Sequence, residues 1–197
     1  GWSFGECKFD WPTLIANKDK EIARLEGLYT ANVEKAGVTI YQDRAVFEDP
    51  HTLLLINSGK RITADRILIA TGNRPTRDMG SDRVVPGAQL CITSDEAFHL
   101  KELPGCIVIG GGGYIAVEFA HIFQGLGSEV ILVCRRDKPL FGFDDDMRDA
   151  LFANMQERGI RVLGHNQFTK EEKTDAGLKV ETDKGASITC DQIMLAI

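Results

Sequence analysis

The chain has 197 residues, 43% of them hydrophobic and 26% charged, which is the composition of a globular protein of one or two domains. Its net charge of −6 argues against a nucleic-acid partner, because such proteins usually carry basic patches. No apolar stretch approaches the ~18 residues of a membrane-spanning helix and no signal peptide opens the chain, so we expect a cytoplasmic protein that binds neither membrane nor nucleic acid.

A long helix is the first predicted element. Asp10 can cap it, Pro12 fits its first turn, and Gly37 stands where it should stop. Apolar residues recur along it at helical spacing: Ile15, Ile22, Leu25, Tyr29 and Val33. The helix is therefore expected to bury one face.

Short strands are predicted after the helix, and they read as a small antiparallel meander. They cover residues 38–41, 44–47, 52–56 and 60–63, with a turn at residues 57–59. The apolar residues 66–70 then predict a buried strand, which ends in Thr71 and Gly72. Residues 73–89 contain several prolines and glycines and no periodicity, so they are predicted to connect two domains, 1–89 and 90–197.

Residues 106–120 predict a buried strand, a glycine turn and the start of a helix. Gly111, Gly113 and Ala116 occupy the G-x-G-x-x-G/A positions of a dinucleotide-binding turn. Such a turn presents backbone N–H groups and a helix N-terminus to a pyrophosphate. A dinucleotide is the favoured ligand, and the alternative is a glycine turn that only lets the helix pack closely on the strand.

The end of the next strand indicates which dinucleotide. An acid about 20 residues after the glycines would bind a ribose 2′-OH, whereas a cation there would bind a 2′-phosphate. Cys134 stands 21 residues after Gly113 and is followed by Arg135 and Arg136. Arginine matches phosphate oxygens, so NADP(H) is favoured over NAD(H). The alternative is that the two arginines belong to a solvated loop.

The remaining pattern continues an α/β fold. A helix is predicted at residues 145–158, between Asp144 as its cap and Gly159 as its stop, and a third parallel strand at residues 160–163. Further strands are predicted at residues 167–170, 178–182 and 187–189, and residues 192–197 are largely apolar. Because the chain ends in this run and opens without a methionine, we expect a central piece of a longer protein.

Cysteine and histidine spacing predicts no metal site. The five cysteines are odd in number and form no C-x-x-C pair, so neither a disulfide framework nor a zinc site is indicated. The four histidines are scattered, and we assign none of them a ligand or acid–base role.

Several motifs together resemble one family. They are Phe-Asp-Trp-Pro-Thr-Leu-Ile-Ala-Asn-Lys at 9–18, Ile-Leu-Ile-Ala-Thr-Gly at 67–72, Thr-Ser-Asp at 93–95, Gly-Gly-Gly-Tyr-Ile-Ala-Val-Glu-Phe-Ala at 111–120 and Arg-Arg-Asp at 135–137. Over the whole chain, the sequence resembles the glutathione reductase branch of the flavin-dependent pyridine nucleotide-disulfide oxidoreductases. The resemblance implies a Rossmann-like NAD(P)-binding domain with a parallel sheet, preceded by a partial FAD-domain segment made of a long helix and a β-meander.

The resemblance also implies residue roles. The family passes electrons from NADPH through FAD and a redox-active disulfide to oxidised glutathione. Tyr114 would cover the flavin until nicotinamide displaces it, and Glu118 would bind the nicotinamide end. Gly112 and Ile115 would line the pyrophosphate and ribose, and Arg135 would hold the 2′-phosphate.

In the first segment, Ala45, Thr71 and Gly72 would lie near FAD, and Tyr29 would touch glutathione. The full-length protein would be a homodimer. The chain lacks the family's Cys-x-x-x-x-Cys redox pair, so it is expected to be inactive by itself.

One departure from the family concerns Phe141, which stands where NADPH-specific members usually have a second arginine. We therefore predict a reduced preference for NADPH, with Arg136 and Lys138 as candidates to replace the missing cation. Two alternatives stay open. One is a reductase that uses NADH or NADPH on a related low-molecular-weight disulfide, such as a modified glutathione, and the other is a non-catalytic nucleotide-binding module.

Overall fold

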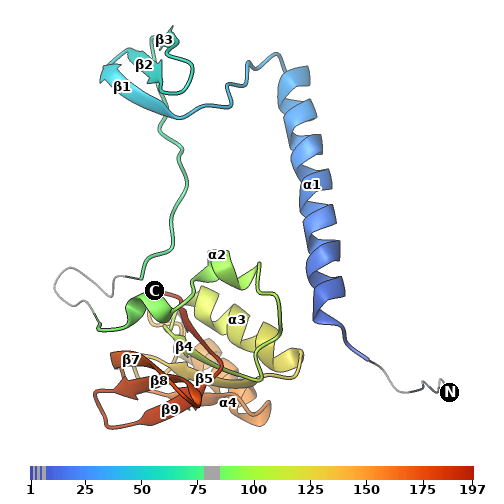
Figure 1. Ribbon diagram of the computed structural model, residues 1–197, viewed down its shortest axis with the longest axis vertical. Helices are drawn as coiled ribbons and strands as arrows, with labels where there is room; N and C mark the ends of the chain where they lie inside the picture. Colours follow the sequence, from blue (N-terminus) through green and yellow to red (C-terminus); the bar gives the residue numbers. More distant parts are fainter. Residues whose placement is uncertain (2, 4, 6–7, 78–84) are drawn as a thin grey trace. The chain divides into compact units, whose positions relative to one another are not determined.

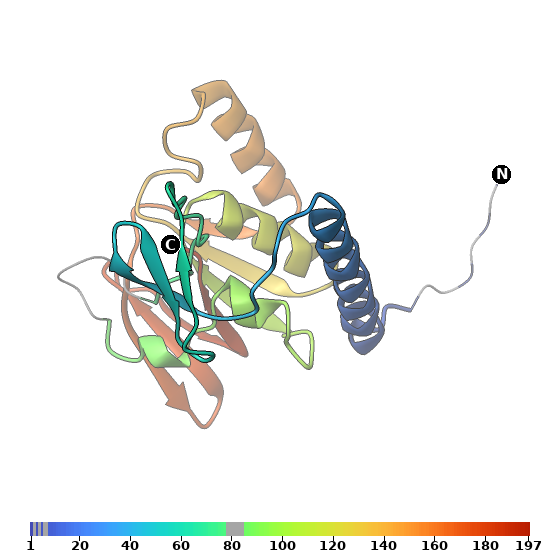
Figure 2. The same ribbon diagram turned by 90° about the horizontal axis from the view of Figure 1, so that it is seen from above.

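The computed structural model describes residues 1–197 except residues 2, 4, 6–7 and 78–84. The chain forms two compact units, drawn in Figures 1 and 2. The larger comprises Gly1–Ile15 and Arg74–Ile197, and the smaller comprises Ala16–Asn73. Part of the predicted connector, residues 78–84, lies outside the described residues, as does Cys7. The predicted domain boundary after residue 89 stays a prediction.

Helix α1, Trp11–Lys35, begins in the larger unit and supplies most of its length to the smaller one. The carboxylate of Asp10 accepts a hydrogen bond from the Thr13 backbone N–H at 2.8 Å, as expected of a cap. Gly37, with a φ of 80°, follows its end. The predicted apolar stripe is not buried, because Tyr29 is 70% exposed and Ile22 is 56% exposed.

The predicted antiparallel meander is confirmed. Its three strands are paired in the order β1-β2-β3, with bounds Ala45–Asp49, Thr52–Leu55 and Arg61–Thr63. The carboxylate of Asp43 accepts hydrogen bonds from the backbone N–H groups of Asn57 and Ser58, which ties the β2–β3 turn to the chain before β1.

Two strand predictions in this unit are wrong. Residues 38–41 and 66–70 form no strand, and Leu68 is 89% exposed and Ile69 67% exposed. A strand is stable only where a neighbouring strand accepts its hydrogen bonds and covers its apolar side chains. Among the described residues, no strand pairs with either segment.

The larger unit is built on a parallel sheet of four strands in the order β10-β4-β5-β6. Their bounds are Gln192–Leu195, Cys106–Gly110, Glu129–Val133 and Arg161–Leu163. The helices are α2 (Ser94–Ala97), α3 (Tyr114–Gly125) and α4 (Asp145–Glu157), preceded by the short η1 (Ala88–Leu90). A second, antiparallel sheet has the order β7-β8-β9, with bounds Phe168–Thr174, Gly177–Thr182 and Ser187–Cys190.

The parallel sheet is covered on both faces (Figures 1 and 2). Because side chains alternate along a strand, Ile107 and Ile109 of β4 face the helices, whereas Val108 faces the antiparallel sheet. All three side chains are fully buried. This is the α/β, Rossmann-like fold that the sequence predicts.

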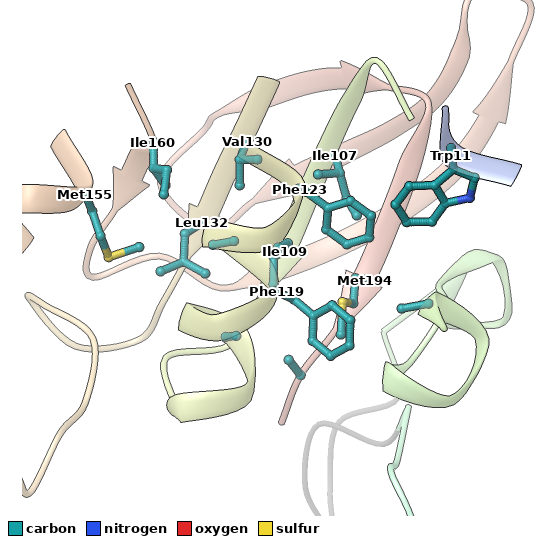
Figure 3. Packing of buried hydrophobic residues seen from close by; sticks show 14 residues of the cluster. Trp11, Ile107, Ile109, Phe119, Phe123, Val130, Leu132, Met155, Ile160 and Met194 are labelled. Carbon is teal, nitrogen blue, oxygen red and sulfur yellow. The ribbon is translucent and has the colours of Figure 1, made fainter. Parts of the chain in front are cut away.

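Aromatic side chains fill the helix-covered face (Figure 3). The rings of Phe119 and Phe123 on α3 stack, with centroids 6.0 Å apart, and the ring of Trp11 stacks on Phe123 at 6.2 Å. The Trp11 indole N–H also donates to the Leu100 carbonyl at 2.8 Å. The first turn of α1 is therefore part of the core of the larger unit.

Candidate functional site

The glycine turn joins the end of β4 to the start of α3. Gly111 has a φ of 147°, and a Cβ there would lie 2.2 Å from the Ala196 carbonyl oxygen. A Cβ on Gly112 would lie 3.1 Å from Cys134 Cβ, whereas nothing lies within 4 Å of one on Gly113. The first two glycines therefore let the backbone pack closely, and the third leaves space for a ligand at the helix N-terminus.

A cleft of about 790 Å³ opens beside this turn, within the larger unit. It lies at the carboxyl ends of the parallel strands, where ligands bind in open α/β sheets. Its lining includes seven residues that the sequence predicted: Gly111, Gly112, Gly113, Tyr114, Ile115, Arg135 and Arg136. The cleft therefore brings the glycine turn and the two arginines together, as predicted.

The loop after β5 forms one wall of the cleft, and it is tied to the glycine turn. The Leu140 N–H donates to the Gly112 carbonyl at 2.7 Å. Leu140 has a φ of 56°, an unusual conformation for a residue with a side chain. A backbone hydrogen bond therefore connects the turn to this loop.

Arg148 on α4, which does not line the cleft, is hydrogen-bonded to the same loop. Only 9% exposed, it donates to the Pro139 carbonyl at 3.1 Å, the Asp137 carboxylate at 3.0 Å and the Asp145 carboxylate at 2.7 Å. The pKa of Asp137 is lowered, first by its hydrogen bond from the Lys138 backbone N–H and then by Arg148. Nothing in the local sequence pattern distinguishes Arg148 from a solvated helix residue, so the sequence analysis missed it.

The charged side chains that line the cleft are all cations. The lining includes Arg135, Arg136 and Lys138, and no acidic side chain of the described residues. Lys138 is paired with the Asp149 carboxylate. The guanidinium of Arg136 lies over the ring of Phe141, with its Cζ 4.3 Å from the ring centroid. Such a lining attracts an anionic ligand.

Cys134 is a buried thiol at the start of the cleft wall. Burial raises its pKa to about 11, and its Sγ lies 3.4 Å from the Arg136 carbonyl oxygen as a hydrogen-bond donor. The thiol is therefore neutral near pH 7 and is no thiolate nucleophile.

The other predicted residues lie elsewhere. Ala116 is fully buried beneath the turn, and Glu118 is exposed on α3 and does not line the cleft. Four more belong to the smaller unit: Tyr29, Ala45, Thr71 and Gly72. All four are exposed, and their predicted contacts stay predictions.

Asn166 and Gln167 also line the cleft, and the sequence analysis did not single them out. A signal was present, because they lie three and four residues after the third parallel strand, at its carboxyl end. The Asn166 amide donates to the Gly164 carbonyl at 2.8 Å and its oxygen accepts from the Thr182 hydroxyl at 2.9 Å, so its side chain is held in place.

A glycine turn between a parallel strand and a helix, beside a cationic cleft, defines a dinucleotide-binding α/β domain. The chain also matches the pyridine nucleotide-disulphide oxidoreductase family over residues 5–197. It belongs to that family. None of the helices in the described part of the chain has the length and apolar character that a membrane crossing requires.

Two curated relatives are similar along nearly the whole chain. A glutathione reductase of Nostoc sp. (strain PCC 7120) is 42% identical over 91% of this chain and 38% of its own length. A trypanothione reductase of Leishmania donovani is 38% identical over 95% of this chain and 40% of its own length. The chain thus spans about two-fifths of the length of the curated relatives that it matches.

Among solved structures, the HOCl-induced flavoprotein disulfide reductase RclA from Escherichia coli is similar in fold. It superposes with a TM-score of 0.84 at 24% identity, over 95% of this chain and 42% of its own. At that identity the likeness concerns the fold alone.

Proposed function

We propose that this chain forms the NADPH-binding domain and part of the FAD-binding domain of a glutathione-disulfide reductase. One observation supports the NADPH site above all others. Arg135 and Arg136 line the same cleft as glycines 111–113, and no acidic side chain of the described residues lines it. A dinucleotide that carries an additional 2′-phosphate suits this lining better than one that carries a 2′-OH.

Different residues of the cleft bind different parts of the cofactor. Gly112 and Ile115 line the pyrophosphate and ribose, where the open space at Gly113 and the N-terminus of α3 receive the phosphate charge. The forked guanidinium of Arg135 binds the 2′-phosphate. Cys134 offers no carboxylate to a 2′-OH, and its neutral thiol is already bonded to the Arg136 carbonyl.

The remaining roles follow the family. When bound, NADPH would supply a hydride for reduction of the FAD, and the residues named below would hold and orient the two cofactors. Tyr114, 61% exposed at the cleft, acts as the lid over the flavin, and Glu118, one helical turn on, holds the nicotinamide end. In the smaller unit, Ala45, Thr71 and Gly72 approach FAD. Tyr29, 70% exposed, contacts oxidised glutathione.

The full-length protein is proposed to be a cytoplasmic homodimer that reduces oxidised glutathione. The similarity to a glutathione reductase supports this substrate. This chain has no Cys-x-x-x-x-Cys pair, so by itself it binds the cofactor without reducing a disulfide.

A related low-molecular-weight disulfide is the second candidate substrate, because the relative from Leishmania donovani is a trypanothione reductase at 38% identity. Turnover of oxidised glutathione and of trypanothione disulfide, measured in a protein that also carries the redox cysteine pair, separates the two candidates.

Calorimetric titration of the chain with NADPH and with NADH tests the cofactor. Arg135→Ala should lower NADPH affinity about 10- to 150-fold, because a hydrogen bond to a charged group contributes roughly 1.5–3 kcal/mol. NADH affinity should stay nearly constant. The loss should shrink as salt rises, since the contact is exposed.

Arg158→Ala provides the matched control. Arg158 is an exposed arginine just beyond the far end of α4, roughly 20 Å along the helix from the loop that carries Arg135. Its removal changes the net charge equally and should leave both affinities unchanged. Equal affinity of the wild type for NADPH and NADH, or an Arg135→Ala variant that behaves like the control, contradicts the proposal.

A further inference from the structure

Phe141 is a large aromatic side chain that is 66% exposed at the cleft. Burial in the core does not explain it. Among the described residues, its ring contacts Arg136, whose guanidinium carbon lies 4.3 Å from the ring centroid. At this distance the cation is attracted to the electron-rich face of the ring.

The charges around this loop single out two cations. Lys138 is paired with the Asp149 carboxylate, and Arg148 with the carboxylates of Asp137 and Asp145. Arg135 and Arg136, in contrast, have no carboxylate within ion-pair distance in the part of the chain that the structure describes. Two full positive charges therefore remain available at the cleft.

The backbone at Arg136 and next to Phe141 is held by hydrogen bonds, so the contact with the ring acts on the side chain of Arg136. The Arg136 carbonyl accepts the His165 N–H at 2.9 Å. On the other side of the loop, the Leu140 carbonyl accepts the Phe143 N–H at 3.0 Å. With the carbonyls of Arg136 and Leu140 both hydrogen-bonded, the remaining freedom of Arg136 is in its side-chain rotamers, and stacking on Phe141 reduces it.

Stacking leaves the guanidinium able to bind phosphate. The attraction to the ring uses the face of the planar group, whereas its five N–H donors point outward in its plane. An ion pair with a carboxylate would occupy those donors. The ring therefore orients the cation without neutralising it.

We propose that Phe141 is a positioning residue that holds Arg136 as a second phosphate-binding cation beside Arg135. This inference rests on the proposed NADPH site. From the sequence alone, Phe141 is expected to weaken the preference for NADPH, because it replaces a cation. In this arrangement the aromatic ring supports that preference through its neighbour.

The test is calorimetric titration of the whole chain with NADPH and NADH, in wild type and in variants. Arg136→Ala should lower NADPH affinity about tenfold, at the low end for a contact to a charged group, and leave NADH affinity nearly unchanged. Phe141→Leu should lower NADPH affinity about 2- to 5-fold, the range of an exposed cation–π contact. Phe141→Tyr keeps the ring and should retain wild-type affinity.

Two further variants separate positioning from general packing. Phe143 also lines the cleft and is 59% exposed, but no cation lies over its ring among the described contacts, so Phe143→Leu should leave the ratio of NADPH to NADH affinity unchanged. The double variant of Arg136→Ala and Phe141→Leu should be no weaker than Arg136→Ala, because Phe141 acts through Arg136.

The contrary outcomes are distinct. If Arg135→Ala lowers NADPH affinity while Arg136→Ala and Phe141→Leu do not, this inference fails and the proposed function stands. If Phe141→Leu lowers NADPH and NADH affinity by the same factor, the ring contacts the nucleotide itself and the positioning role is wrong. Equal affinity of the wild type for both cofactors overturns both proposals.

Discussion

Two short apolar segments, β4 and residues 66–70, differ in structure: the first is a buried strand and the second forms no strand. In β4, which lies between β5 and β10, Ile107, Val108 and Ile109 are fully buried. Residues 66–70 contain a similar Ile-Leu-Ile run but pair with no strand among the described residues, and Leu68 is 89% exposed. Apolar composition makes a segment competent to be a strand, and the presence of neighbours decides whether it becomes one.

The same contrast separates the two units. In the larger unit, two clusters of buried side chains cover the parallel sheet, one on each face. In residues 16–73, Leu55 is the one buried side chain. Since burial supplies most of the favourable free energy of folding, a given substitution should have very different effects in the two units.

The largest expected effect is a loss of stability on truncating the core. Ile109→Ala should lower the free energy of unfolding by about 2–5 kcal/mol, because it removes buried methyl groups and leaves a cavity. Ile69, which is 67% exposed, is the matched position, and Ile69→Ala should change the free energy of unfolding by less than about 0.5 kcal/mol. Urea unfolding followed by circular dichroism measures both, and similar losses would erase the contrast between the units.

A smaller effect is expected from adding one methyl group to a glycine. Gly111→Ala should lower the free energy of unfolding by about 2–3 kcal/mol, through contact with the Ala196 carbonyl and an unfavourable positive φ. It should also weaken NADPH binding, because the turn must shift. Gly72 has a φ of 70° with nothing within 4 Å, so Gly72→Ala should cost only about 1 kcal/mol.

Urea unfolding and calorimetric titration with NADPH measure these two effects on the same samples. If Gly111→Ala binds NADPH as tightly as Gly72→Ala does, the close approach at the turn has no role in the site.

The smallest expected effect is a pH-dependent change at Glu171. This side chain is 3% exposed, its carboxylate oxygens have no hydrogen-bond partner among the described residues, and burial raises its pKa to about 7. In residues 16–73, by contrast, the pKa of Asp43 is lowered, chiefly by a hydrogen bond from the Asn57 N–H. Burial in the larger unit therefore disfavours the charged form of Glu171, whereas hydrogen bonds favour the charged form of Asp43.

The sign of the pH effect follows from that raised pKa. The folded state keeps the Glu171 proton more tightly than the unfolded state, whose carboxyl has its ordinary value of 4.5. Stability is therefore full below pH 4.5 and falls as pH rises through about 7. Glu171→Gln removes this loss, so the variant should be about 1–3 kcal/mol more stable than wild type at pH 8 and nearly equal at pH 4.5.

The neighbouring Glu172 is the control for this experiment. Its pKa is lowered, first by a hydrogen bond from Lys170 and then by one from Lys179. Glu172→Gln should therefore bring no gain in stability at pH 8. Urea unfolding at the two pH values measures both variants, and a gain shared by both would trace the effect to net charge rather than to burial.

The sequence by itself determined the local features of this protein. The helix that starts after Asp144 follows from its cap, whose side chain accepts the N–H groups of Asp146 and Met147. The glycine turn and the two arginines that line the cleft were also readable, because spacing along one strand–turn–helix unit fixes their places. In each case the residues lie within a few positions of one another or at a fixed spacing along one strand–turn–helix–strand unit.

Only the tertiary structure decided the contacts between distant segments. Leu140 adopts a positive φ because its loop bonds to Gly112, and Arg148 is buried because that loop closes over it. The stacking of Arg136 on Phe141 depends on the same loop, so composition alone reads Phe141 as a missing cation. Residues 66–70 form no strand for the converse reason, because a segment's hydrogen bonds and burial are supplied by its neighbours in space and not by its own side chains.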